Sequence, residues 1–160
     1  MKKLFISILF ACLPLTGVLA QDAYNSIRSK AATEVEDPLT NGMVKQISQF
    51  KVDALDYMMI KMRDQMPDSS TSYLDSQAVA LNEFINLYIK KILEINVLPK
   101  NKQVKVIRAF MDASYSNPLF NDPDTELTLS YYSKMDCLTR FSLDTDWRKA
   151  SVAVVEALKE

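Results

Sequence analysis

The stretch FNDPDTEL, residues 120–127, carries four side chains with oxygen atoms that could bind a metal ion: Asn121, Asp122, Asp124 and Glu126. A calcium loop of the EF-hand type needs oxygen ligands at positions 1, 3 and 5, a glycine at position 6 and a glutamate at position 12. Counted from Asp122, position 6 is Leu127 and position 12 is Ser133. The stretch therefore lacks the sharp turn and the last ligand of such a loop.

The same residues fit the first turn of a helix better. The side chain of Asp122 can accept a backbone hydrogen bond, and Pro123 tolerates the first helical position. The two acidic residues that follow place negative charge at the positive end of the helix dipole. Asp144 and Asp146 form a second acidic pair, but about 16 residues of helix, or roughly 24 Å, would separate them from Asp122. We therefore predict a helix start at Asp122 and no metal site.

Three methionines, Met58, Met62 and Met66, recur every four residues and so share one face of a predicted helix. Thioether sulfurs bind Cu(I), but methionine is also a common filler of irregular core space or of an adaptable binding surface. The sequence has no histidine to complete a copper site, and Cys137 is distant along the chain. We favour a structural role for this methionine row.

Six basic residues surround a predicted turn between two helices and share that stretch with a single acid, Glu94. They are Lys90, Lys91, Lys100, Lys102, Lys105 and Arg108. The segment 117–146 is acidic by comparison, and such an asymmetry can steer a polyanion or another subunit. A solvated surface is the simpler interpretation. Aromatic residues are too few here to stack nucleic-acid bases, so we predict no nucleic-acid partner.

The residue types that are absent exclude several chemistries. Without histidine there is no Ser-His-Asp or Cys-His catalysis, no His-bound zinc and no imidazole pH switch. Beyond residue 20 the sequence has one glycine, Gly42, and hence no glycine-rich loop for a phosphate or dinucleotide. No nucleophile has a recognisable base near it in sequence. We predict no catalytic and no cofactor-binding residues, and the composition favours a protein that is not an enzyme.

The first twenty residues predict a secretory signal peptide, residues 1–20. Lys2 and Lys3 form its basic start, an apolar segment follows, and the sequence ending in Ala20 suits a signal peptidase. Cleavage there would leave Gln21 as the first residue of an exported protein, either periplasmic or extracellular. No later segment is long and apolar enough to cross a bilayer, so we predict no transmembrane segment.

The two cysteines, Cys12 and Cys137, do not predict a disulfide. Cys12 would leave with the signal peptide. Its lipidation is an alternative, but bulky Phe10 lies where a small residue is usual. Cys137 alone cannot make an internal disulfide. We interpret it as a buried thiol, with an intermolecular disulfide or a reactive thiol as the alternatives.

Removal of residues 1–20 would leave 140 residues with 17 basic and 20 acidic side chains, for a net charge of −3. This length suits one domain with a substantial core. The charge is ordinary for a globular protein and implies no bulk affinity for nucleic acid or acidic lipid.

Residues 21–36 are predicted to form a flexible tail, because only a weak apolar face interrupts a polar stretch. The helical domain would then span residues 37–160 and begin at Asp37-Pro38, which resembles a helix cap with a proline in the first turn. A second helix would start at Ser72 with Asp75 as a partner resembling a capping box. Asp144 is predicted to cap the last helix.

Apolar residues recur at helical spacing in five segments. The five segments cover approximately residues 37–66, 72–97, 100–115, 123–141 and 145–158. Leu127, Leu129 and Tyr131 also alternate, so the segment 123–141 could instead contain a strand. The sequence therefore predicts an all-α, single-domain bundle of four or five mostly antiparallel helices.

These observations favour a small exported helical protein that binds another protein or a second copy of itself. The alternative is an envelope hydrolase or an apolar-ligand carrier whose site forms only in three dimensions. A pocket with facing carboxylates would favour the hydrolase, and an apolar cavity would favour the carrier. An exposed apolar surface would favour the binding protein. The sequence leaves the partner and the oligomeric state open.

Overall fold

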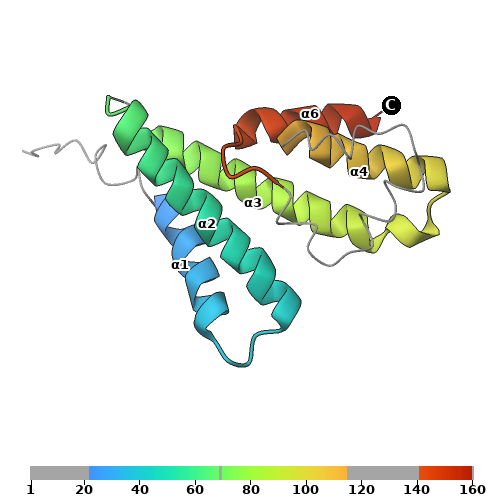
Figure 1. The fold of residues 1–160 in the computed structure, drawn as a ribbon, viewed down its shortest axis with the longest axis horizontal. Coiled ribbons are helices and arrows are strands. Elements are labelled where there is room, and N and C mark those ends of the chain that lie inside the picture. The colour runs from blue at the N-terminus through green and yellow to red at the C-terminus, as the bar shows by residue number, and fades with distance from the viewer. Residues whose placement is uncertain (1–21, 69, 115–140, 160) are drawn as a thin grey trace, which may run out of the picture.

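The computed structural model describes residues 22–68, 70–114 and 141–159, and the structural statements below concern these residues alone. They form five α-helices and one short 3₁₀ turn, with no strand among them (Figure 1). The elements are α1 (Asp22–Glu36), α2 (Gly42–Gln65), α3 (Thr71–Leu93), η1 (Ile95–Val97), α4 (Lys100–Ser114) and α6 (Trp147–Lys159). This confirms the all-α class. The predicted signal peptide, the FNDPDTEL helix start and Cys137 lie outside the described residues.

Helix α3 is the centre of the bundle, and consecutive helices run in opposite directions (Figure 1). The hairpin of α1 and α2 packs along one side of α3, while α6 packs along another side and is itself covered by α4. A helix surrounded in this way should be apolar on most of its circumference. Its buried residues are Leu74, Gln77, Ala78, Ala80, Leu81, Phe84, Ile85 and Tyr88.

The helical spacing of apolar residues predicted most of this core. Leu74, Ala78, Leu81, Phe84, Ile85 and Tyr88 of α3 are buried as expected, and so are Val104, Ile107 and Met111 of α4. Ile89 and Ile92, on the same predicted face of α3, are only partly buried, and Val44 and Val155 are exposed. Full burial of a large aliphatic or aromatic side chain is worth roughly 1.5–3 kcal/mol, so the buried residues dominate the stability of the bundle. The predicted helix end near residue 66 is confirmed, because α2 ends at Gln65. The helix predicted to reach residue 97 ends earlier, at Leu93, and the turn η1 follows it.

An aromatic cluster joins α2, α3, α4 and the segment that leads into α6. It comprises Phe50, Phe84, Tyr88, Phe110, Phe141 and Trp147, in edge-to-face pairs with ring centroids 5.1–6.1 Å apart. Such pairs are worth about 0.5–1.5 kcal/mol beyond the area that they bury. The ring of Phe84 contacts three other rings of the cluster, those of Phe110, Phe141 and Trp147. The cluster therefore fixes the start of α6 against the middle of α3.

The expectation of a flexible tail at residues 21–36 is wrong, because residues 22–36 form helix α1 and pack on α2 and α3. Ala31, which belongs to the weak apolar face of this stretch, is buried, and so is Tyr24, which does not belong to that face. The Tyr24 hydroxyl donates to Leu55 O at 3.5 Å. Burial raises the pKa of this hydroxyl, and the nearby Asp56 carboxylate raises it further.

Side chains from other helices hold α1 in place. Arg28 forms a forked pair with Asp56 of α2, with Nε–Oδ1 at 2.5 Å and Nη2–Oδ2 at 2.8 Å. The backbone N–H of Tyr24 donates to Asp75 Oδ1 of α3 at 2.9 Å. Asp75 thus satisfies an amide in the first turn of α1, where intrahelical acceptors are lacking. This finding corrects the expectation that Asp75 supports the start of its own helix.

The structure also corrects the predicted start of the helical domain, and of its first predicted helix, at Asp37-Pro38. The N–H of Asp37 donates to Thr33 O at 3.0 Å and so still belongs to the last turn of α1. The Asp37 carboxylate then accepts from Leu39 N at 2.9 Å, within the loop. The cap of α2 is Asn41, whose Oδ1 accepts from Met43 N at 2.8 Å.

Candidate functional site

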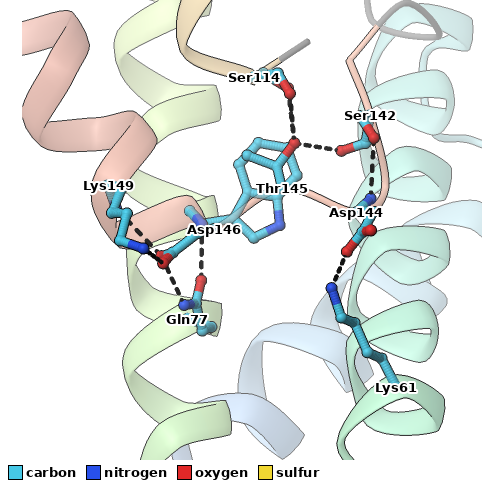
Figure 2. Close-up of polar contacts among 9 residues, drawn as sticks. Lys61, Gln77, Ser114, Ser142, Asp144, Thr145, Asp146 and Lys149 are labelled. Atoms are coloured by element: carbon cyan, nitrogen blue, oxygen red, sulfur yellow. Dashed lines mark hydrogen bonds and ion pairs between the residues drawn. The ribbon is translucent and has the colours of Figure 1, made fainter. Parts of the chain in front are cut away.

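Polar side chains concentrate at residues 142–146, the segment that precedes α6. Figure 2 shows these residues between side chains of α2, α3 and α4. The segment separates two hollows of the surface, and Tyr73 of α3 and Asp146 line both of them. We treat this junction and its two hollows as the candidate functional site.

Gln77 of α3 and Asp146 hold the first turn of α6. Asp146 Oδ1 accepts from Gln77 Nε2 at 2.9 Å and from the backbone N–H of Lys149 at 3.3 Å. The second bond is the N-cap of α6, so Asp146 and not the predicted Asp144 caps this helix. Gln77 Oε1 accepts from Trp147 N at 2.8 Å. Gln77 is only 1% exposed, and both ends of its amide are satisfied.

The Asp146 carboxylate is stabilised in its charged form. Burial by itself would raise the pKa of Asp146. Hydrogen bonds from Gln77 and from the backbone and ammonium group of Lys149 outweigh that effect and hold the pKa below its ordinary value of 3.8. Lys149 Nζ lies 3.2 Å from Asp146 Oδ2. The carboxylate is therefore deprotonated near neutral pH and acts as a structural hydrogen-bond acceptor. It has no proton to donate as a general acid.

Thr145 and Asp144 attach the segment to α4 and α2. Thr145 Oγ1 lies 2.6 Å from Ser142 O and 2.9 Å from Ser114 O, and its one proton can serve either carbonyl. Asp144 pairs with Lys61 on the outer side of the segment (Figure 2). The pair is exposed and worth about 0.2–1 kcal/mol at most. Asp144 therefore contacts α2, which explains why it does not cap α6.

The smaller hollow, about 260 Å³, lies between α2 and the segment 142–146. Its apolar lining includes Met58, Met66 and Leu143, and its polar lining includes Lys61 and Asp144. Two members of the methionine row thus line this hollow. Met58 belongs to the core, and Met62 packs against the core from a partly buried position. The row contributes to the packing of α2, in agreement with its structural interpretation.

The larger hollow is an open groove of about 720 Å³ between α3 and α6. The two helices run in the same direction, because Gln77 meets Trp147 and, further along, Ala80 O accepts from Ser151 Oγ at 3.0 Å. Val79 and Val152 line the groove and are exposed to solvent. An exposed apolar lining between two fixed helices is a common feature of binding surfaces.

Charged residues give this groove two different ends. Arg148 and Lys149 stand at the start of α6, beside Asp146. Glu83 and Glu156 line the groove further along the shared direction of α3 and α6. One end therefore carries two cations and one carboxylate, and the other end carries two carboxylates. A bound helix or strand would meet opposite charges along its length.

The carboxylates and hydroxyls that could act in catalysis at this site are engaged in structural contacts. Both carboxylates of the segment 142–146 bind cations, and the hydroxyls of Ser114 and Thr145 contact each other at 3.1 Å. Ser48 donates to Glu34 at 2.5 Å, but Ser48 is fully buried between α1 and α2. In the described ranges, no group of three or more potential ligands among His, Cys, Asp and Glu could hold a metal ion.

Sequence reasoning had missed Gln77, Tyr73 and the groove. Gln77 interrupts an apolar helical face, and a polar residue at such a position signals a buried hydrogen-bond partner. The basic residues singled out in the sequence do not join this site, because they surround the turn between α3 and α4. No helix within residues 22–68, 70–114 and 141–159 is long and apolar enough to cross a membrane.

Comparison with known proteins gives no relative for this bundle: no family model, curated protein or solved structure matches the chain.

Proposed function

We propose that this chain is a small exported helical protein that binds a polypeptide partner in the groove between α3 and α6. The observation that supports this proposal is the pair Val79 and Val152, which face solvent in a groove bordered by opposite charges. An amphipathic helix that lays its apolar stripe in such a groove would cover both valines. Export is supported by the sequence of residues 1–20.

The charges of the groove suggest how the partner helix is oriented. A helix carries partial positive charge at its N-terminus and partial negative charge at its C-terminus. We expect the N-terminus to lie against Glu83 and Glu156, and the C-terminus to lie against Arg148 and Lys149. The two hollows differ in what they could bind, since the 260 Å³ hollow is too small for a helix and could take only a small molecule.

Site-specific photocrosslinking in the native cell would test the proposal. A photoreactive residue at Val152 should crosslink to one discrete polypeptide, and Val79→Arg should abolish that product by placing a cation in the apolar part of the groove. The matched control is a photoreactive residue at Leu39, which is exposed in the loop between α1 and α2. A similar product at both positions would argue against the groove.

The same experiment separates the alternatives. A crosslink between two copies of this chain would identify self-association as the binding event. No crosslink, together with a rise in melting temperature on addition of a fatty acid, would favour a carrier that uses the smaller hollow.

A further inference from the structure

We infer that the partner in the groove between α3 and α6 is a second copy of this chain. The inference rests on the proposed function, because it concerns the same groove and names its occupant. Two copies would pack groove to groove about a two-fold axis, with each α6 antiparallel to α6 of the other copy. Such an interface uses the same surface on both subunits, so this surface must be complementary to itself.

The exposed face of α6 carries its charges at a symmetric spacing. Arg148, Val152 and Glu156 follow one another at intervals of four residues, so they share one face of the helix. All three are exposed, and all three line the groove. Val152 lies midway between the cation and the carboxylate, about 6 Å along the helix axis from each. Reversal of the helix about Val152 therefore exchanges the positions of the two charges.

An antiparallel contact centred on Val152 brings complementary groups together along the whole face. Arg148 of each copy would face Glu156 of the other copy, so the ion pair would occur twice. The two Val152 side chains would meet at the axis. This arrangement also places the positive N-terminus of each α6 against the negative C-terminus of the other, which is the orientation expected of a partner helix in this groove.

The two charges that would form this pair are exposed and have no competing ion pair within the chain. Among residues 22–68, 70–114 and 141–159, no ion pair engages Arg148 or Glu156. Lys149 differs, because its Nζ already lies 3.2 Å from Asp146 Oδ2 of the same copy. Glu83 of α3 adds a second carboxylate to the end of the groove that Glu156 lines. Arg148 would therefore meet a doubly acidic end of the other copy.

Exposed valines supply the apolar part of the interface. Val152 and Val155 of α6 are 58% and 42% exposed, and Val79 of α3 is 41% exposed. Ala80 and Ala153 also line the groove, and such short side chains let a facing helix approach closely. The apolar area is small for a stable interface, so we expect a dimer that dissociates on dilution.

The order of the charges favours a second copy over the other possible occupants. A parallel pair of α6 helices would bring Arg148 against Arg148 and Glu156 against Glu156, and like charges in contact disfavour association. An unrelated protein would need a carboxylate, an apolar side chain and a cation in the reverse order at the same spacing. A second copy carries this pattern in every case.

Charge reversal tests the inference by sedimentation velocity of the purified chain over a range of concentrations at low salt. Arg148→Glu alone and Glu156→Arg alone should each weaken the dimer by roughly tenfold or more, because like charges would meet at two places. An equimolar mixture of the two variants should restore a dimer, since both contacts between them again join opposite charges. Both substitutions complement the dipole of α6, so the variants should remain folded.

Matched controls make the same kinds of change elsewhere. Arg63→Glu reverses a charge in the last turn of α2, and Val97→Asp replaces an exposed valine in η1. Both should leave the association unchanged. Val152→Asp should abolish it, because two carboxylates would meet at the axis. A dimer that survives the single charge reversals, or a mixture of the two variants that stays monomeric, would overturn the inference.

A wild type that is monomeric at every concentration would also overturn the inference, and the photocrosslinks would then test the proposed function separately. A crosslink from Val152 to a different polypeptide, lost in Val79→Arg, would keep the groove as the binding site of that partner. The absence of any crosslink from Val152 would remove the proposed function as well.

Discussion

Gln77 and Asp146 lie 69 residues apart in the sequence and are joined by a hydrogen bond of 2.9 Å at the start of α6. The bond couples the cap of one helix to a buried amide on another helix. We expect Asp146→Ala to cost about 1 kcal/mol for the lost cap and a further 1–3 kcal/mol, approximately, for the unsatisfied Gln77 amide. Urea unfolding would measure the loss.

Asp144→Ala is the control for this change, because Asp144 is the neighbouring acid that resembles a cap in the sequence. It makes an exposed pair with Lys61, so its loss should cost less than about 1 kcal/mol. Equal destabilisation by the two substitutions would contradict the assignment of Asp146 as the cap.

The lowered pKa of Asp146 predicts a change in stability with pH. A carboxyl group whose pKa is lower in the folded state stabilises that state above its unfolded pKa, and the stabilisation is lost as the pH falls through the folded pKa. For Asp146 the loss should therefore occur below the ordinary value of 3.8. The Asp146→Asn variant should lose less stability than the wild type as the pH falls from about 4.5 to about 2. Parallel pH profiles of the two proteins would contradict the prediction.

The contacts of α1 predict slow hydrogen exchange near the N-terminus. Amides of residues 26–36 should be protected in the wild type, whereas a flexible tail would exchange at once. Asp75→Ala should speed exchange at Tyr24 by removing its acceptor, while Asp75→Asn should retain most of the protection because an amide oxygen still accepts. Unprotected α1 amides in the wild type would restore the expectation of a tail.

The methionine row predicts a packing defect and no copper effect. Met58 is 7% exposed in the core, and Met58→Ala should destabilise the protein by roughly 2–4 kcal/mol. Met66→Ala should cost less, because Met66 lies at the end of α2 and is only partly buried. Anaerobic Cu(I) should leave the melting temperature unchanged. A large increase in the melting temperature of the wild type with Cu(I), absent in the Met62→Ala variant, would identify a copper site.

The signal peptide predicts the mass of the exported chain. Cleavage after Ala20 should leave a protein that begins at Gln21, which intact-mass measurement of exported material would detect. A lipidated N-terminus at Cys12 would contradict this cleavage site and would support the alternative.

The core of the fold could be predicted from sequence because its signal is local. The apolar residues of α3 and α4 recur at the helical period, and Pro67 and Pro99 mark where helices cannot continue. Helix α1 could not be recognised in this way, since its stability comes from Asp56 and Asp75 on other helices. Residue spacing within 22–36 contains no information about those partners.

The same limit applies to the start of α6 and to the candidate site. The sequence predicts Asp144 as the cap of the last helix, whereas Asp146 caps α6, because the contacts that decide between them involve Lys61 and Gln77, which are distant in the chain. The groove between α3 and α6 depends on the packing of two helices that are not consecutive. The six basic residues around the turn between α3 and α4 were visible in the sequence, but the exposure of Leu93 and Val97 in that turn required the structure.

Two of the polar residues of α3 that bind other helices, Asp75 and Gln77, give the protein a definite order of assembly during synthesis. Asp75 and Gln77 are two positions apart on α3, and residues so spaced do not share a helix face. Asp75 binds Tyr24, 51 residues upstream, so this contact can form as soon as α3 has left the ribosome. Gln77 binds Trp147, 70 residues downstream. A nascent chain must therefore shield one side of α3 by other means until α6 has been synthesised.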